Sequence, residues 1–507
     1  MKYLTTCIII TMTRSALSIL LLIPVFFSFS CSQVDQKRFN QNRIQPYTEN
    51  PTYWQYQSKP VLLVGTSSDD NLFQSDTLER ELDSIVSHGG NYLRCTMSGR
   101  DSGNVKPFVM SIESPSKYDL ENLNPEYWQK FEHFLQATHE RQMFVQIEVW
   151  ASYDFYERAG LPWRSSPFNP VNNVNYTTAE TGLPSEFHSR GFEAINPFFE
   201  SVPSLKNIPL VLRYQQAFVD KLLSISLSYD HVLYCMDNET NAHPKWSEYW
   251  AEYIKKKASL QGLDIETTEM WDTADPSNGA VPDAYVQDVE THPFITRSNV
   301  SVTLQNPAFY TYLDISNHNA QKGQVHFETG YYVWTQVQES GILRPINCVK
   351  IYGGGDDENS WGGDNQAGQE RFWRNVFAGI AAVRFHRAPA GLGHSSLALR
   401  HVKSMRMLMD ELDIFSCRPN NDLLSDRQVN EAYCLADPGR ACAVVFLDGG
   451  QCGLELSAMQ ERIRVRWLDI LNSQWQPEIV LNKSDTLNLS APDNGFWGVL
   501  IEKAADR

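Results

Sequence analysis

The stretch that decides the fold is residues 231–240, HVLYCMDNET, in which an apolar strand-like run ends in a cluster of polar side chains. Apolar residues recur at helical spacing before it, over 211–229, and again after it, over 246–260. A buried strand between two helices is typical of a parallel sheet that helices cover on both faces. We therefore look for the same alternation on both sides of this stretch.

The alternation extends from about residue 60 to residue 400. Strand-like apolar runs lie at 60–65, 91–97, 144–150, 231–236, 266–271, 310–315, 344–352 and 380–385. Helical spacings lie at 78–88, 128–139, 211–229, 246–260 and 369–377. About eight strand–helix units of this length predict an α/β fold, a (β/α)8 TIM barrel, rather than an open sheet, because no glycine-rich nucleotide motif follows the first strand.

After about residue 425 the pattern becomes one of short strands separated by turns. The runs lie at 432–435, 442–447, 453–456, 463–468, 486–489 and 496–501. Turn residues such as Asp437-Pro438-Gly439 and Asp448-Gly449-Gly450 separate them. The sequence therefore predicts a barrel over 51–424, followed by a small antiparallel β-sandwich domain over 425–507.

The N-terminus resembles the export signal of a bacterial lipoprotein. An apolar run of 14 residues, 16–29, follows Arg14 and is short for a membrane span, and Cys31 comes directly after it. We expect a lipoprotein signal peptide over 1–31 with lipidated Cys31, then a polar tether over 32–50. The protein would be exported and held at the bacterial cell envelope by its lipid alone. The alternative is a membrane-anchoring helix.

Composition narrows the function classes. The chain has 43 Lys+Arg against 60 Asp+Glu, a formal net charge of −17, which argues against nucleic-acid binding. No Cys-x-x-Cys pair occurs among its nine cysteines, which argues against zinc and redox sites. Aromatic residues make up 12% of the chain, enough to build a core and also to line a sugar groove. The sequence predicts no cofactor and no metal, and it leaves the oligomeric state open.

The polar end of the deciding stretch carries the candidate chemistry. Active sites of TIM barrels lie at the C-terminal ends of the strands, where Asn238 and Glu239 follow strand four. Glycoside hydrolysis needs one carboxylic acid to protonate the leaving oxygen and a second carboxylate as nucleophile or base. Glu239 is our candidate acid/base, with a pKa raised by burial or by a neighbouring carboxylate. Arg94, on strand two, could hold the second carboxylate ionised.

At these residues the chain resembles the clan of (β/α)8 glycoside hydrolases. Its members carry Asn-Glu after strand four, as Asn238-Glu239 here, and often an Arg on strand two, as in the run GNYLR of residues 90–94. More narrowly, residues 50–54 (NPTYW) and 493–501 (DNGFWGVLI) resemble apiosidase-like barrel proteins that end in a sandwich labelled as collagen-binding. The resemblance implies a glycoside hydrolase acting on a polysaccharide or oligosaccharide, with Glu239 as its acid/base.

One position departs from the clan. Its nucleophile is a Glu at the end of strand seven, where this chain has Lys350. The loop beyond is acidic, and Asp357 or Glu358 is our candidate for the missing carboxylate, activating water in an inverting reaction. A solvated lid or a cation site is the alternative for this loop, although the spacing of its acids is not that of an EF-hand.

Further residues near strand ends are candidates for substrate binding. These candidates are Arg94, Glu148, Trp150, Trp163, Asn238, Trp271, Tyr352, Trp361 and His386. We expect Trp150, Trp163 and Trp361 in particular to offer flat faces for sugar rings. Each could instead be a structural residue.

Two other functions stay open. The first is a surface glycan-binding protein on a barrel that has lost catalysis, which Lys350 favours and Asn238-Glu239 opposes. The second is collagen binding by the sandwich, which follows only from the family label.

Overall fold

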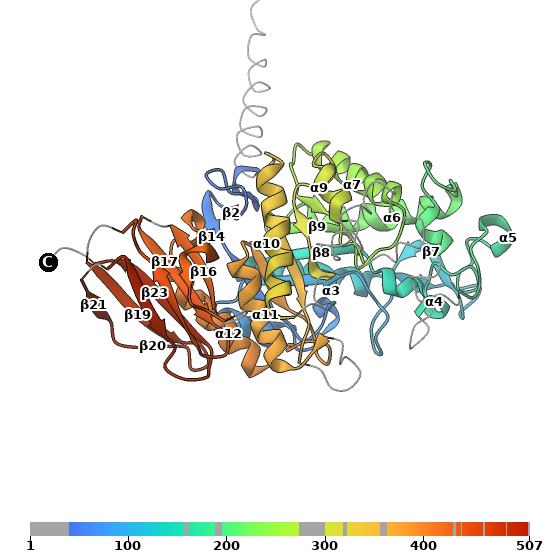
Figure 1. Cartoon of the computed structure of the whole chain (residues 1–507). Coiled ribbons are helices and arrows are strands. Elements are labelled where there is room, and N and C mark those ends of the chain that lie inside the picture. The colour runs from blue at the N-terminus through green and yellow to red at the C-terminus, as the bar shows by residue number, and fades with distance from the viewer. Residues whose placement is uncertain are drawn as a thin grey trace, which may run out of the picture.

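The protein is described by a computed structural model that covers residues 40–156, 162–187, 195–272, 300–317, 322–354, 362–428, 432–437, 439–459, 462–482 and 484–504. The predicted signal peptide, Cys31, Asp357, Glu358 and Trp361 lie outside the described residues. Figure 1 shows a barrel of strands and helices and, beside its helices α11 and α12, the sheets of the C-terminal region in red. Among the residues that the structure describes, no helix combines the length and the apolar character needed to cross a membrane.

Two parallel four-stranded sheets form the barrel, in the orders β10-β9-β8-β5 and β11-β12-β13-β4. Its strands are β4 (Leu63–Thr66), β5 (Tyr92–Thr96), β8 (Phe144–Trp150), β9 (Val232–Asp237), β10 (Thr267–Thr268), β11 (Leu313–Asp314), β12 (Ile346–Ile351) and β13 (Ala382–Phe385). At one seam the Asn91 amide donates to the Val64 carbonyl at 2.8 Å, and at the other the Thr311 amide donates to the Thr267 carbonyl at 2.8 Å. These bonds close the predicted TIM barrel.

Gly65 lets the first seam close. A Cβ atom at this position would lie 1.8 Å from the carbonyl oxygen of Tyr92 on the neighbouring strand. Only a residue without a side chain allows β4 and β5 to approach this closely.

Helices surround the barrel and begin at recognisable signals. They are α2 (Leu78–Ser87), α3 (Pro125–Glu140), α6 (Pro209–Ser226), α7 (Pro244–Ser259), α10 (Gly323–Glu339), α11 (Asn365–Phe377) and α12 (Ser396–Glu411). Three of them, α3, α6 and α7, start with proline, and the side chains of Asp364 and Ser395 cap α11 and α12. Short elements decorate the barrel: α4 (Pro162–Ser165), α5 (Thr178–Thr181), α9 (Val300–Gln305), and the 3-10 turns Leu72–Gln74, Ser152–Phe155 and Pro197–Glu200. A hairpin of β6 (Phe108–Met110) and β7 (Tyr118–Leu123) adds to them.

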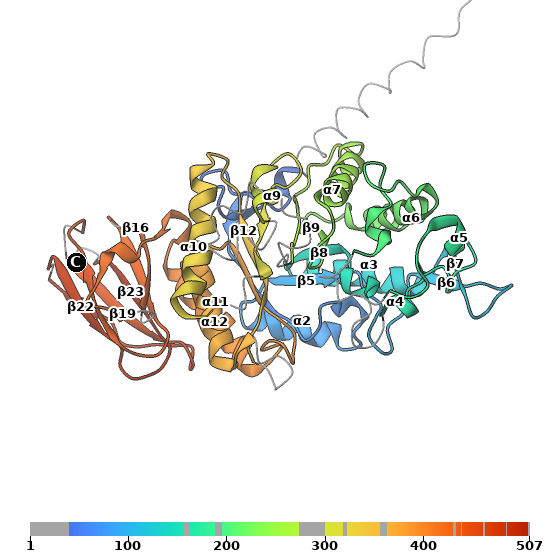
Figure 2. The same cartoon turned by 45° about the vertical axis from the view of Figure 1, so that its right-hand side comes forward.

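The C-terminal region is antiparallel, as predicted. One sheet contains β14 (Arg418–Pro419), β16 (Ala432–Asp437), β17 (Ala441–Phe446), β23 (Trp497–Lys503), β19 (Ile463–Asp469), β20 (Gln474–Trp475) and β21 (Ile479–Leu481). The other contains β15 (Leu424–Ser425), β18 (Gln451–Glu455) and β22 (Thr486–Ser490). Buried side chains of both sheets, including Val444 and Leu454, share one core. Helices α10, α11 and α12 lie between this region and the barrel strands (Figures 1 and 2).

The structure corrects the sequence prediction at several places. The predicted strand 60–65 is two strands, since β3 (Lys59–Val61) forms a hairpin with β2 (Trp54–Tyr56) and only β4 enters the barrel. The end of the predicted tether is packed, because β1 (Gln45–Pro46) pairs with β2 and Ile44 is buried. β14 lies before residue 425 yet belongs to the large C-terminal sheet. Helices α10 and α12 had no predicted counterpart.

Candidate functional site

Charged side chains from strands on all sides meet at the C-terminal mouth of the barrel. They are Asp70 after β4, Arg94 in β5, Glu148 in β8, Glu239 after β9, Lys350 in β12 and Arg384 in β13. All of them are at most 8% exposed. Because parallel strands end on the same side of a barrel, residues far apart in sequence converge there. We call these six residues the mouth ring.

Glu239, a member of the mouth ring, has a left-handed backbone conformation. Its φ angle is +54°, a left-handed value that a non-glycine residue adopts at a cost of about 1–3 kcal/mol. Its Oε1 atom lies 2.5 Å from the Lys350 ammonium and accepts a hydrogen bond from the Tyr352 hydroxyl at 3.2 Å. The same ammonium donates to Asn238 Oδ1 at 2.7 Å. Lys350 therefore crosses the mouth and ties together the Asn-Glu pair after β9.

This ion pair decides the charge of Glu239. Burial alone would raise the pKa of the carboxyl, but the Lys350 ammonium, together with a hydrogen bond from Tyr153, outweighs burial and lowers the pKa to about 2. Our prediction of a raised pKa is wrong, because the neighbour is a cation and not a second carboxylate. Near neutral pH Glu239 is an ionised hydrogen-bond acceptor without a proton to give.

The second carboxylate of the mouth, Glu148, is also engaged. Arg94 Nε donates to Glu148 Oε1 at 2.6 Å, and the Thr96 hydroxyl donates to Oε2 at 2.6 Å. Glu148 is fully buried, so neither oxygen has open space for water. The structure thus brings two predicted residues, Arg94 and Glu148, into one tight ion pair.

Within the mouth ring, Asp70 has the largest number of ion-pair neighbours. The sequence analysis did not identify this residue. Its carboxylate lies 2.8 Å from Arg94 Nη1, 3.0 Å from Arg387 Nε and 3.5 Å from His386 Nδ1. Arg384 and Arg100 lie at 3.7 and 3.9 Å. Burial opposes ionisation of Asp70, but the guanidinium groups around it, that of Arg94 first, outweigh burial and hold the pKa of Asp70 well below its usual value. The polar run Ser67-Ser68-Asp69-Asp70 just past a barrel strand is the signal that would have found it.

Two of the three predicted stacking faces, Trp150 and Trp163, are buried, and so is the predicted substrate-binding residue Trp271. Trp150, Trp163 and Trp271 are at most 1% exposed, so no sugar can reach their rings. Trp150 stacks on Phe218 at 5.3 Å within the core, and Trp271 donates to the Thr303 hydroxyl at 2.7 Å. Trp150 fills the space between β8 and the helices α6 and α7, and Trp163 packs on Phe155.

The predicted Tyr352 and His386 do lie at the mouth. Their rings are 4.5 Å apart, and they are 8% and 6% exposed. Burial, reinforced by the neighbouring arginines, keeps the pKa of His386 well below its usual value although Asp70 opposes this, so His386 is neutral at pH 7.

A small cavity lies beside the ring. Its volume is about 30 Å³, and Lys106, Trp150, Asp154 and Phe168 are among its lining residues. Such a volume has room for a water molecule or two and is far too small for a sugar ring.

A buried acid pair lies behind Glu239. The Trp246 indole donates to Asp237 Oδ2 at 2.9 Å, and Glu269 Oε1 accepts from the backbone amides of Asp237 and Met270 at 2.9 and 2.8 Å. Burial raises the pKa of Glu269 to about 7 and that of Asp237 well above its usual value. Both side chains are fully buried, so the pair ties β9 to β10 rather than facing the mouth.

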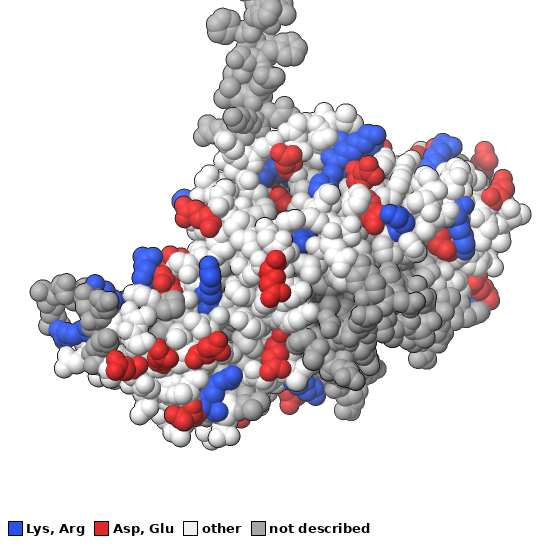
Figure 3. All heavy atoms as spheres, turned by 45° about the horizontal axis from the view of Figure 1, so that its top comes forward, with Lys and Arg blue, Asp and Glu red and all other residues white. Residues whose placement is uncertain are grey.

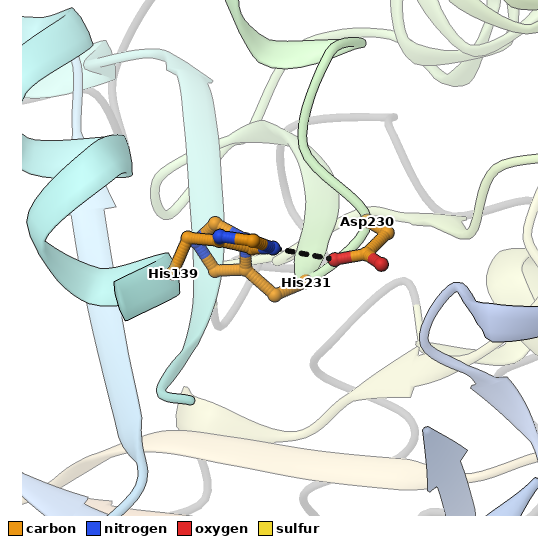
Figure 4. Close-up of side chains that lie close together, drawn as sticks. All are labelled: His139, Asp230 and His231. Atoms are coloured by element: carbon orange, nitrogen blue, oxygen red, sulfur yellow. Dashed lines mark ion pairs between the residues drawn. The ribbon is translucent and has the colours of Figure 1, made fainter. Parts of the chain in front are cut away.

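His139, Asp230 and His231 form a second cluster, from the end of α3 and the start of β9 (Figure 4). His139 Nε2 lies 3.3 Å from Asp230 Oδ1, which also accepts from the Tyr56 hydroxyl at 2.9 Å. Burial and then the charges of His139 and Arg43 lower the pKa of His231 well below its usual value. With Asp230 already engaged and a guanidinium close by, the cluster suits packing better than a metal ion.

Comparison with known proteins supports the fold. No protein-family model matches the chain, and no curated protein matches its sequence. A solved glycoside hydrolase family 5 structure from Bacteroides vulgatus is 10% identical, with a TM-score of 0.60 over 92% of this chain and 95% of that one. Another solved glycoside hydrolase is also 10% identical, with a TM-score of 0.58 over 93% of this chain and 99% of the other.

The chain shares the (β/α)8 barrel fold of these solved structures. At 10% identity the likeness extends to the fold alone. The narrower resemblance to apiosidase-like proteins and the collagen-binding label of the sandwich stay predictions from the sequence.

Proposed function

We propose that this chain binds carbohydrate at the mouth of its barrel and does not cleave glycosidic bonds by the paired-carboxylate mechanism. The observation that carries the proposal is the 2.5 Å ion pair between Lys350 and Glu239. A general acid must hold a proton when the substrate binds, whereas the pKa of Glu239 is about 2. Each carboxylate of the mouth ring is paired with a cation in the same way, Asp70 and Glu148 with Arg94.

What the mouth offers a sugar is a set of fixed polar groups. The Glu239 carboxylate can accept hydrogen bonds from hydroxyl groups, and the rings of Tyr352 and His386 lie beside it, each of the three side chains being 6–8% exposed. The export and lipid attachment expected from the sequence would place this site outside the cytoplasm, where glycans are met.

Hydrolysis is the second candidate, and the strained φ of Glu239 favours it. Backbone strain of this kind concentrates at functional sites, active sites included. A hydrolase would have to release Glu239 from Lys350, protonate it when substrate binds, and take its second carboxylate from Asp357 or Glu358.

One experiment separates the two. The purified chain is titrated by calorimetry with a panel of plant, algal and host oligosaccharides, and the mixtures are then assayed for new reducing ends. We expect binding without release of reducing ends. Release that disappears in Glu239→Gln, while binding persists, would establish the hydrolase instead, and absence of binding to any glycan would refute the proposal.

A further inference from the structure

The first residues that the structure describes lie at the floor of the barrel, the end at which its strands begin. Asn40 contacts the loop between α7 and β10, where its side-chain amide donates to the Gly262 carbonyl and its Oδ1 atom accepts from the Asp264 amide at 3.2 Å. This loop precedes a barrel strand, whereas the C-terminal ends of the parallel strands form the mouth. Asn40 is therefore at the end of the barrel opposite to the candidate site.

The next residues of the chain are fixed to the same floor. The buried Arg43 guanidinium donates to the Leu227 carbonyl at 3.4 Å. The Ile44 amide donates to the Asp230 carbonyl at 2.8 Å, and the Tyr56 hydroxyl donates to Asp230 Oδ1 at 2.9 Å. Leu227 and Asp230 lie between α6 and β9, so the segment is held where β9 begins. The chain thus reaches the barrel at a defined point of its floor.

Few residues separate this point from the predicted lipid. Eight residues, 32–39, lie between Cys31 and Asn40. Nine steps of at most about 3.6 Å limit the distance from Cys31 to Asn40 to about 32 Å. The mouth is further away, because a strand of seven residues such as β8, tilted by about 36° to the barrel axis, raises it roughly 19 Å above the floor. A lipid on Cys31 therefore keeps the floor near the bilayer.

Apolar side chains project from the loops of the floor. Leu260, in the loop that Asn40 contacts, is 76% exposed, and Ile342, in the loop between α10 and β12, is 50% exposed. Val86, near the end of α2, is 38% exposed. Such side chains are suited to the headgroup boundary of a bilayer, where they leave water. Because a lipid already holds the chain at the membrane, a few of them suffice for a stable contact.

Opposite charges accompany these side chains. Figure 3, in which the top of Figure 1 comes forward, shows basic and acidic side chains next to each other. Lys257 pairs with Asp220 at 2.8 Å. Lys256, one turn before Leu260, is exposed and has no ion pair with another residue that the structure describes, and Asp264 is exposed in the following loop. The attachment point and the apolar side chains, rather than net charge, therefore favour the bilayer.

We propose that the floor of the barrel rests on the lipid bilayer, with Leu260 and Ile342 at the headgroup boundary, and that the mouth faces away from the membrane. This orientation rests on the predicted lipidation of Cys31 and not on what the mouth binds. It goes beyond the proposed function, and it would let a polysaccharide approach the mouth without meeting lipid.

Fluorescent labels on single introduced cysteines test the orientation. The described cysteines of the chain are at most 3% exposed, so an introduced exposed cysteine reacts selectively in the folded protein. Leu260→Cys and Ile342→Cys carry the label at the floor. Ile112→Cys is the matched control, because Ile112 is 97% exposed in the hairpin of β6 and β7, which follows β5 at the mouth end. The lipidated full chains are reconstituted into vesicles of phosphatidylcholine and phosphatidylglycerol, with and without doxyl-labelled phosphatidylcholine as a quencher.

We expect the doxyl lipid to lower the fluorescence of both floor labels by about twofold or more and to leave the Ile112→Cys label unchanged. Equal quenching at the floor and at Ile112→Cys, or quenching at neither, would overturn the inference, and so would mass spectrometry that finds no lipid on Cys31. Self-quenching between the floor labels of two chains, with no effect of the doxyl lipid, would assign the floor to a second copy instead. Because no glycan is present, none of these outcomes bears on carbohydrate binding by the mouth.

Discussion

Replacing Lys350 by methionine tests whether the ion pair between Lys350 and Glu239 stabilises the ionised carboxylate. The pKa of Glu239 falls from an ordinary value of 4.5 to about 2 in the folded chain. At about 1.4 kcal/mol for each pKa unit, this corresponds to about 3 kcal/mol of folding free energy from the carboxyl group, and burial, which lowers the pKa of Lys350, offsets part of it. Because the folded pKa lies below the unfolded one, this contribution is complete above pH 4.5 and is lost as the pH falls toward 2.

In Lys350→Met the carboxylate stays buried without its cation, so its pKa should rise above 4.5. We expect the free energy of unfolding at pH 7 to fall by about 3 kcal/mol or more. The gap to the wild type should narrow steadily between pH 5 and pH 3. Urea unfolding followed by tryptophan fluorescence at several pH values measures both quantities.

The double variant Lys350→Met/Glu239→Gln is the control, because it removes both charges together. It should be more stable than Lys350→Met at pH 7. The double variant has no charge at either position, so any change between pH 5 and pH 3 in the difference between its unfolding free energy and that of the wild type should come only from loss of the wild-type ion pair. A gap between Lys350→Met and the wild type that stays constant from pH 7 to pH 3 would refute the assignment of Glu239 as a carboxylate stabilised by Lys350.

Three further predictions concern the frame around the site. Trp150→Ala should cost about 3–5 kcal/mol of stability by opening a core cavity and leave glycan affinity unchanged, so weakened binding by a fully folded variant would contradict its structural role. Glu269→Gln should have about the same unfolding free energy as the wild type at pH 5 and one about 3 kcal/mol higher at pH 8. The reason is that the folded pKa of Glu269 is about 7, so its ionisation destabilises the wild type as the pH rises, and a pH-independent difference in urea midpoints would count against this. Gly65→Ala should strongly destabilise the barrel because its methyl group would overlap the Tyr92 carbonyl, and a thermal unfolding midpoint close to that of the wild type would show that the seam can open.

The sequence was most informative where a single local pattern decides the structure. The strand β8 was predicted to its residue bounds, because Val145, Ile147 and Val149 alternate with Gln146 and Glu148 between aromatic residues at both ends, a strand-like period of two. β10 and β11 pair over two residues each, too short for a pattern to delimit. Helix α10 was not predicted from the sequence, because much of it consists of glycine, valine, threonine and tyrosine, which are poor helix formers.

The same distinction applies to the site. Looking past each strand end located Arg94, Asn238, Glu239 and Lys350, since barrel geometry alone brings them together. That Lys350 pairs with Glu239 depends on side-chain reach across the mouth, which no spacing in the sequence encodes. The prediction that Trp150 faces the mouth is wrong, because an aromatic residue at a strand end can equally face the surrounding helices, where Trp150 is buried.

A single-turnover incubation of the wild-type chain with a glycan that it binds tests whether Glu239 can act as a general acid. The protein is present in molar excess, the pH is varied from 4 to 8, and the products are resolved by mass spectrometry. We expect the glycan to be recovered intact throughout, because Glu239, with a pKa of about 2, holds no proton over this range. Cleaved product that forms with the wild type and is absent with Glu239→Gln would contradict it.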